Sequence, residues 1–286
     1  MSAGVKTEFT FTGYGKNYVK LLQVRKEGKI HYIKEIEVNS QLTLNNTKDY
    51  LQGDNSDIIA TDSQKNTVYV LAKQHGVKTI EKFALLLCDH FLNKYRHVTR
   101  ANVYIEEAPW KRIEIGGQEH SHSFILNRDI TRFCEVEHKR DSRPMVSAGI
   151  KDLKIMKTTQ SAFVKFVNDE FRTLPDAEDR VFCTIVQSRE GVKKITLETF
   201  AGEPREGVYS PSVQNTLYLT EQNVLTKIPQ IEEIEMVLPN VHYFDVDFKR
   251  FPKIDFKRNQ IQVLQPVDKP SGNIKAAIKR SVKSRL

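Results

Sequence analysis

Apolar and polar positions alternate along the first part of the chain. This period of two over Glu8–Gly15, Tyr18–Lys26 and Ile30–Val38 predicts three strands. The polar stretch Lys26–Lys29 contains a glycine and predicts a hairpin turn between the second and third strands.

The period changes to that of a helix after Asp62. Val68, Leu71, Ala72 and His75 follow the i, i+3, i+4, i+7 spacing of one helical face, and Gly76 is placed to end the helix. A second helix is predicted from Thr79, without a capping box because Lys82 stands at the position of the acid or amide. Its expected apolar face consists of Ile80, Phe83, Ala84, Leu87 and Phe91.

The start of the first helix, within "NSDIIATDSQKNTVYVLAK" (Asn55–Lys73), combines two kinds of chemistry. Thr61 or Asp62 is suited to cap the helix through a side-chain oxygen. Free backbone N–H groups at a helix N-terminus also suit an anion. The two roles are compatible, and we expect Thr61 and Asp62 to begin the helix and to contact a ligand.

Elements of the same kinds recur through the rest of the chain. Three further strands are predicted at 97–110, 121–126 and 131–138, and the polar segment 138–149, broken by Pro144, is the expected domain boundary. Later strands are predicted at 153–159, 180–187, 231–239 and 241–248, and helices at 161–171, 192–202 and 210–228. The pattern predicts a duplicated α+β unit, with domains at 1–143 and 144–286.

Composition places the chain among globular proteins. The 286 residues are 39% hydrophobic and 28% charged, and no apolar run approaches the roughly 18 residues of a membrane span. The N-terminal sequence lacks the apolar block of a secretory signal. Cys88, Cys134 and Cys183 show no paired spacing, which argues against a disulfide framework; Cys88 is expected to fill core space.

A net charge of +8 favours anionic partners, but the excess is partly local. The last twelve residues, "KAAIKRSVKSRL", hold five Lys and Arg and no acids. Elsewhere no dense basic stripe occurs, so nucleic-acid binding is an open alternative that the charge does not require. Steering of a small anionic ligand is equally compatible with this charge.

Several common catalytic signatures are missing. The sequence has no P-loop, GxSxG, HExxH or CxxC motif, and Gly13-Tyr14-Gly15 lacks the third glycine and the helix of a dinucleotide loop. His120 and His122 fall on one face of a predicted strand without an evident third ligand, so we expect a polar surface and no metal site.

The final tripeptide Ser284-Arg285-Leu286 is similar to the terminal address that the peroxisomal import receptor reads. It predicts a peroxisomal protein, a compartment in which enzymes commonly make or consume hydrogen peroxide.

The segment "KTTQSAFVKFVNDEFRTLPDAEDR" (Lys157–Arg180) resembles the signature of the urate oxidase (uricase) family. The resemblance extends in family order over "TGYGKNYVK", "GDNSDIIATDSQKNTVYVLAK", "HVTRANVYIEEAPWKR", "SPSVQNTLY" and "LPNVHYF". It implies two tandem tunnelling-fold (T-fold) domains, each an antiparallel sheet with helices on one face. It also implies a homotetramer in which the sheets close into a barrel around active sites between subunits.

The same resemblance implies a reaction and roles for individual residues. The expected activity is that of a urate:oxygen oxidoreductase, which converts urate and dioxygen to 5-hydroxyisourate and hydrogen peroxide without metal or flavin. Lys16, Thr61 and His242 would move protons, and Asn240 with Thr61 would hold dioxygen or water. The expected urate contacts are Arg180, Gln214, Phe163, the Val213 backbone N–H and, from a neighbouring subunit, Thr61 and Asp62.

Each of these residues taken alone also has an ordinary structural explanation, as a core aromatic, surface ion pair, helix surface or turn residue.

One departure from the family pattern bears on the expected activity. The sequence around residues 188–193 passes almost directly from strand to helix, where the family has a longer segment. An inactive relative that binds purine or only assembles is therefore the alternative function, because a lost strand pair would expose unpaired backbone groups.

Overall fold

The computed structural model describes residues 7–127, 130–189, 192–247, 262–267 and 271–281. The chain divides into two compact units, 1–148 and 149–286. The division falls inside β7 (Met145–Lys157), whereas the sequence predicts a boundary in the loop just before this strand. Both units are antiparallel sheets combined with helices, the α+β class expected from the sequence.

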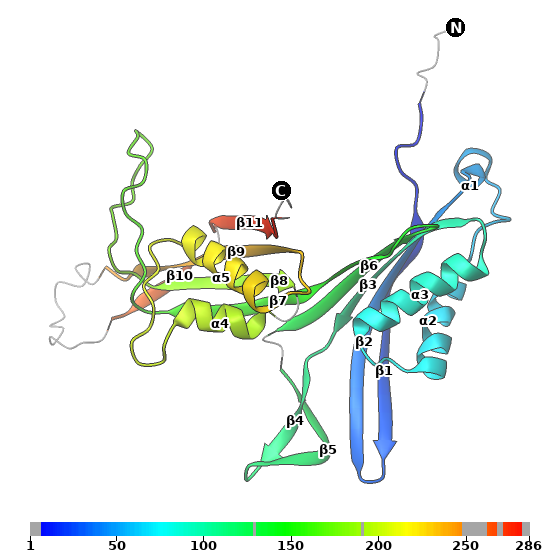
Figure 1. Cartoon of the computed structure of the whole chain (residues 1–286), viewed down its shortest axis with the longest axis horizontal. Helices are drawn as coiled ribbons and strands as arrows, with labels where there is room; N and C mark the ends of the chain where they lie inside the picture. Colours follow the sequence, from blue (N-terminus) through cyan, green and yellow to red (C-terminus); the bar gives the residue numbers. More distant parts are fainter. Residues whose placement is uncertain (1–6, 128–129, 190–191, 248–261, 268–270, 282–286) are drawn as a thin grey trace, which may run out of the picture. The chain divides into compact units, whose positions relative to one another are not determined.

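Unit 1 holds a four-stranded antiparallel sheet in the order β1-β2-β3-β6. The strands are β1 (Tyr14–Glu27), β2 (Ile30–Leu44), β3 (Val98–Glu107) and β6 (Thr131–Lys139). A separate hairpin joins β4 (Trp110–Ile115) to β5 (Gln118–Leu126). Helix α1 (Lys48–Gln52) is short, and α2 (Thr61–His75) and α3 (Ile80–Lys94) pack on the sheet (Figure 1).

The core of unit 1 follows the predicted helical face. Helix α3 packs on β3 and β6, and its five predicted apolar residues are all buried. Facing it, Ala101, Val103 and Ile105 of β3 are fully buried, as their alternation predicts. Burial of each large side chain stabilises the fold by about 1.5–3 kcal/mol relative to exposure. Thr79 caps α3 by accepting a hydrogen bond from the backbone of Lys82.

Two predictions about the strands and the helical face of unit 1 are wrong. Residues 8–13 form no strand, because β2 pairs with β1 only as far as Tyr14, and Phe9 and Phe11 are about half exposed. His75 is exposed, although the helical period places it on the buried face of α2. It is the last residue of the helix, and Gly76 then turns the chain with φ of 68°.

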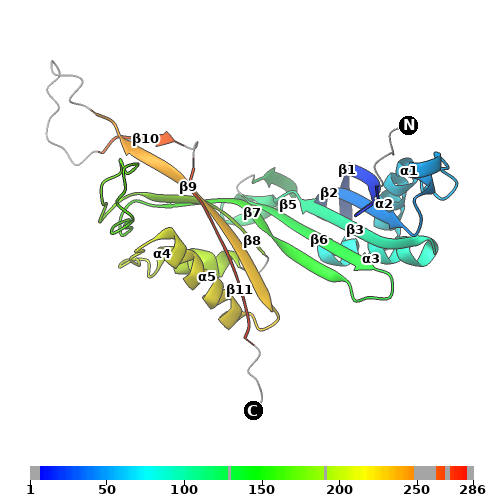
Figure 2. The same cartoon turned by 90° about the horizontal axis from the view of Figure 1, so that it is seen from above.

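Unit 2 repeats the strand–helix order of unit 1. Strand β7 pairs with β8 (Phe182–Arg189), and β8 pairs with β9 (Glu233–Asp245). The other edge of β9 pairs with β10 (Leu264–Val267) and β11 (Asn273–Lys279). Helices α4 (Lys193–Ala201) and α5 (Val213–Lys227) lie on the same side of this sheet (Figure 2).

The connection from β8 to α4 is short, as the sequence indicates, whereas the matching connection in unit 1 contains α1. The sheet does not lose a strand as a result, because β8 has hydrogen-bonded neighbours on both sides. Two predicted strands, 231–239 and 241–248, merge into the single strand β9, with Pro239 inside it.

The three cysteines are buried and none forms a disulfide, as the sequence predicts. Cys88 is fully buried in α3. Among the described residues, the helices are too short or too polar to cross a bilayer.

Candidate functional site

The segment between β7 and β8 leaves the end of the unit 2 sheet and returns to it (Figure 1). The sequence predicts a helix at 161–171, and this prediction is wrong. Phe163 instead exchanges two backbone hydrogen bonds with Ala177, of 2.7 and 3.0 Å. The Arg180 N–H donates to the Ser161 carbonyl at 2.9 Å. These distant partners satisfy the backbone groups that a helix would have paired locally.

The side chains of Phe163 and Arg180 lie together on this segment. The guanidinium carbon is 5.0 Å from the Phe163 ring centroid, and Phe166 stacks on Phe163 at 4.4 Å. In the described part of the chain no carboxylate pairs with Arg180, and its Nε is buried without a hydrogen-bond partner. Burial lowers the Arg180 pKa, although a guanidinium stays charged at physiological pH.

Backbone hydrogen bonds hold the residues before α5 against the segment that contains Phe163. Ala162 donates its N–H to the Ser210 carbonyl at 2.9 Å, and Ser210 precedes the helix cap Ser212. The Ser212 hydroxyl accepts from the Asn215 N–H, whereas the N–H groups of Val213 and Gln214 have no partner within a helix. Val213 is buried and Gln214 is exposed. The structure thus joins the segment that carries Phe163 and Arg180 to the chain that leads into α5, whose first residues are Val213 and Gln214.

Asn240 and His242 lie on β9 and share one face of the strand. Asn240 is buried and pairs with Thr184 of β8, so it is a strand residue here and no turn residue. The His242 ring stacks on Phe244, with centroids 5.9 Å apart. Cys183, the second residue of β8, pairs with Val241, which lies between Asn240 and His242. Asn240 and His242 therefore lie at the end of the sheet from which the segment with Phe163 departs.

The remaining predicted residues, Lys16, Thr61 and Asp62, belong to unit 1. Helix α2 begins at Thr61, as predicted, but its N-cap is Ala60, with no side-chain capping bond. The prediction that Thr61 or Asp62 caps the helix is therefore wrong. Both are exposed first-turn residues, and Asp62 accepts from Lys65 and Asn66. The Lys65 bond is the largest cause of its lowered pKa, to which the charge of Lys16 adds.

Three polar contacts fix the start of α2 against the sheet. Fully buried Gln64 accepts from the Ser40 hydroxyl at 2.9 Å and donates to the Ile59 carbonyl at 3.2 Å. The Tyr14 hydroxyl accepts from the Ile59 N–H at 2.9 Å. Since Lys16 stands opposite Ser40 in the β1–β2 ladder, these bonds hold Lys16 and Thr61 in one region of unit 1.

Sequence reasoning missed the residues that connect this architecture. Ser161 and Ser210 are almost fully buried, and both make bonds that join segments far apart in the sequence. Gln64 has the same role in unit 1. Serine and glutamine are ordinarily surface residues, so no local pattern marks them as buried.

The other sequence candidates give no further site. The rings of His120 and His122 lie 4.6 Å apart, and His31 lies 5.6 Å from His122. The described residues contain no group of three His, Cys, Asp or Glu side chains arranged to hold a metal ion. Ser284, Arg285 and Leu286 lie outside the described residues.

Comparison with known proteins gives consistent results. The family model described as Uricase matches residues 12–137 and 146–275. The uricase of Oryctolagus cuniculus is 48% identical over 294 residues, covering 98% of this chain and 97% of that protein. The uricase of Danio rerio is 49% identical over 293 residues, with the same coverage.

Solved structures resemble the chain over a similar length. The crystal structure of uricase from Arthrobacter globiformis matches with a TM-score of 0.88 and 32% identity, covering 99% of this chain and 98% of that chain. The range matched by the family model includes residues 188–193, and the relatives match over nearly the whole of both chains, so the comparisons give no support to the alternative of an impaired relative.

Proposed function

This chain belongs to the uricase family, and we propose that it oxidises urate with dioxygen at the sheet end of unit 2. The observation that carries the proposal is the guanidinium of Arg180. It is half-buried, lacks a carboxylate among the described residues, and lies over the Phe163 ring beside the N-terminus of α5. A flat anion fits this combination of aromatic face, cation and free backbone N–H groups.

Each group has a role toward urate that follows from its chemistry. The planar fork of Arg180 donates two parallel hydrogen bonds to the ring edge. The Gln214 carboxamide both donates and accepts, which suits adjacent carbonyl and N–H groups. Phe163 stacks on the purine face, and the Val213 N–H contributes a further contact. Together they hold the ring in one orientation for reaction.

The reaction consumes urate, dioxygen and water and yields 5-hydroxyisourate and hydrogen peroxide. Two electrons pass from deprotonated urate to dioxygen, so in this proposal no metal or flavin takes part. Lys16, Thr61 and His242 take up and return the protons. Asn240 with Thr61 holds dioxygen, or the water that later adds to the ring.

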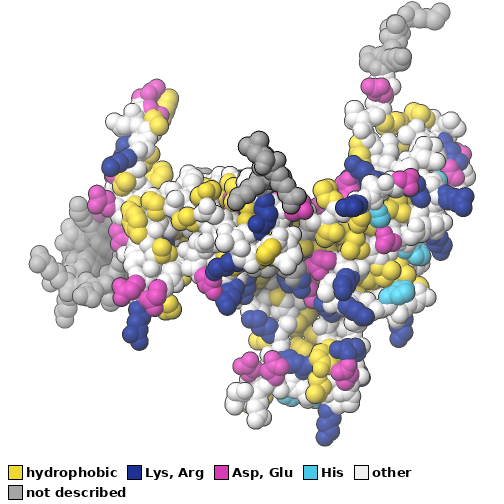
Figure 3. All heavy atoms as spheres, in the orientation of Figure 1, with side chains coloured by type: hydrophobic (Ala, Val, Ile, Leu, Met, Phe, Trp, Pro, Cys, Tyr) yellow, Lys and Arg dark blue, Asp and Glu magenta, His cyan; other side chains and the backbone are white. Residues whose placement is uncertain are grey.

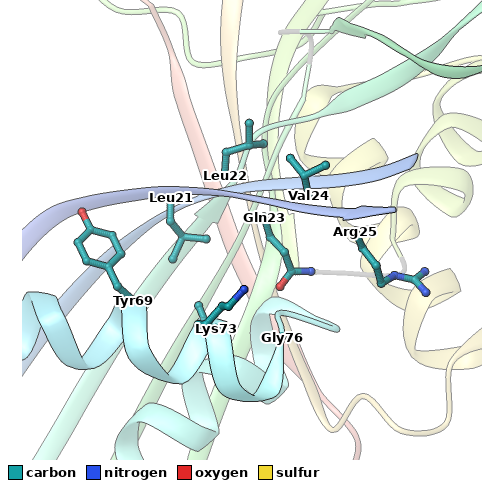
Figure 4. Close-up of a pocket in the computed structure, with 9 residues that line it drawn as sticks. Leu21, Leu22, Gln23, Val24, Arg25, Tyr69, Lys73 and Gly76 are labelled. Atoms are coloured by element: carbon teal, nitrogen blue, oxygen red, sulfur yellow. The ribbon is translucent and has the colours of Figure 1, made fainter. Parts of the chain in front are cut away.

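Lys16, Thr61 and Asp62 come from a second copy of the chain in this proposal, which makes assembly necessary for activity. Unit 1 offers a suitable edge, because β1 is paired only with β2 among the described strands. Exposed apolar side chains occur on both units (Figure 3). Leu22 and Val24 of β1 are among the exposed apolar residues. Between β1 and Tyr69 and Lys73 of α2 lies a groove of about 520 Å³ (Figure 4).

The assembly that we propose is a homotetramer in which the sheets close into a barrel. Pairing of exposed strand edges between copies satisfies their free N–H and C=O groups. We also propose that the chain is peroxisomal and that Ser284-Arg285-Leu286 binds the import receptor, which places its hydrogen peroxide in a compartment equipped to remove it.

The test of function compares two arginines of the same segment. Purified protein in chelator-treated buffer is mixed with urate in air, and loss of urate absorbance and peroxide formation are followed. Arg180→Gln is expected to raise KM for urate at least about tenfold, because the pair of charge-assisted hydrogen bonds from the guanidinium to urate is lost. Arg172→Gln is the control, since Arg172 stacks on Phe166 and pairs with Asp176. No turnover by assembled, unaltered protein, or equal effects of both substitutions, would refute the proposal.

A further inference from the structure

Lys157, the last residue of β7, has an environment unlike that of the other lysines of this strand. Its Nζ donates to the Val208 carbonyl at 2.8 Å and to the Ser210 hydroxyl at 2.9 Å. The ammonium also lies 5.4 Å from the Phe200 ring centroid. In the part of the chain that the structure describes, no carboxylate pairs with it. Burial without an anionic partner lowers its pKa.

Ser210, the acceptor of this bond, is 3% exposed and joins three segments of the candidate site. Its hydroxyl also bonds the Thr216 hydroxyl at 2.6 Å, one turn into α5. Its backbone N–H donates to the Gln160 carbonyl at 2.8 Å, and its carbonyl accepts from Ala162. The position of Ser210 therefore determines both the backbone before Phe163 and the first turn of α5.

We propose that Lys157 is a positioning residue for urate: through Ser210 it fixes the α5 N-terminus, with Val213 and Gln214, against the segment that carries Phe163 and Arg180. This inference rests on the proposed function and adds a residue to its site. Lys157 bonds to residues next to those that hold the ligand-binding groups, so its hydrogen bonds act on the ligand through them.

A cation serves this role better than a neutral donor for two reasons. Hydrogen bonds from an ammonium are shorter and stronger than those between neutral groups, so both acceptors are held more rigidly. In a partly desolvated site the positive charge also favours a bound anion. A lysine with a purely structural role would ordinarily be paired with a carboxylate, because burial of an unpaired charge is costly.

The experiment substitutes Lys157→Met, which keeps the length and the apolar stem but removes the charge and the donors. Binding of xanthine, a purine with the same dione edge as urate, is measured by titration calorimetry, and KM and kcat are measured with urate. We expect Kd for xanthine and KM for urate to rise about tenfold while kcat changes less than about threefold. Lys154→Met is the matched control, since Lys154 is exposed on the same strand.

Ser210→Ala removes only the acceptor hydroxyl and is the second variant. It should raise both constants in the same direction. The effect of the double variant should be smaller than the sum of the two single effects, because both substitutions remove the Lys157–Ser210 bond, whereas the bond to Thr216 is lost only with Ser210. If Lys157→Met does not fold, the Kd for xanthine and the KM for urate of Ser210→Ala test the positioning role instead.

A lower melting temperature with unchanged Kd and KM would overturn the positioning role and leave a structural one. If unaltered protein neither binds xanthine nor oxidises urate, the proposed function fails and this inference fails with it. Wild-type turnover with unaffected variants refutes only the role of Lys157.

Discussion

Glu221 provides a test of the unit 2 core that is independent of catalysis. Glu221 is a residue of α5, and its side chain is completely buried. One of its carboxyl oxygens accepts a hydrogen bond from the Met236 N–H of β9 at 3.1 Å. The other oxygen has no hydrogen-bond partner among the described residues. Desolvation by burial is the main cause that raises the Glu221 pKa from 4.5 to about 7.

The sign of the effect on stability follows from proton uptake. Between the two pKa values the folded protein holds a proton on Glu221 that the unfolded chain has released, so stability falls as pH rises. The loss begins near pH 4.5 and is complete above about pH 7. At about 1.4 kcal/mol for each pKa unit, the whole difference is about 3 kcal/mol.

Glu221→Gln removes this titration while keeping an amide oxygen for the Met236 N–H. The free energy of unfolding of both proteins is measured by urea titration at pH 4.5 to 8, at one protein concentration. We expect the variant to gain about 3 kcal/mol relative to the unaltered protein across this range. A constant difference at every pH would refute the reasoning.

Glu198→Gln is the control with the opposite sign. Glu198 on α4 is surface-exposed and paired with Lys227 and Lys194, and the Lys227 bond is the main cause that lowers its pKa. Its contribution to stability is present above its unfolded pKa and is lost as pH falls through the folded value. The Glu198 variant should therefore lose stability relative to the unaltered protein as pH rises toward 4.5, and the difference should stay nearly constant above that pH, where the Glu221 variant gains stability.

Three further predictions concern the proposed assembly and chemistry. Thr61→Ala should lower kcat about 100-fold, as loss of a proton-transfer group does, yet cost less than about 0.5 kcal/mol of stability, because Ala60 is the N-cap; equal small losses would leave Thr61 no catalytic role. Val24→Lys places a charge in the groove beside β1 and should reduce the assembled mass in light scattering without altering far-ultraviolet circular dichroism; an unchanged mass would exclude this edge from the interface. Removal of Ser284-Arg285-Leu286 should abolish import of the protein into peroxisomes while kcat/KM stays unchanged; continued import would exclude the tripeptide as the address.

The elements with strong local periodicity were predictable from the sequence. The buried face of α3, the alternating burial along β3 and the turn between β1 and β2 each depend on residues that are close together in the sequence. Phe163, Arg180, Val213, Gln214, Asn240 and His242 were identified through family motifs, and the structure places all six in unit 2.

What the sequence could not determine depends on partners distant along the chain. Residues 161–171 have the spacing of a helix, but Ser161 accepts from the Arg180 N–H, and its neighbours Gln160 and Ala162 both bond to Ser210. Such distant pairs leave no local period. The partly buried cation Lys157 resembles any lysine at the end of a strand until Ser210 and Val208 are folded against it. Local amphipathicity thus determined the helices and strands, whereas long-range hydrogen bonds decided how the site is held together, because only the folded chain brings their donors and acceptors into contact.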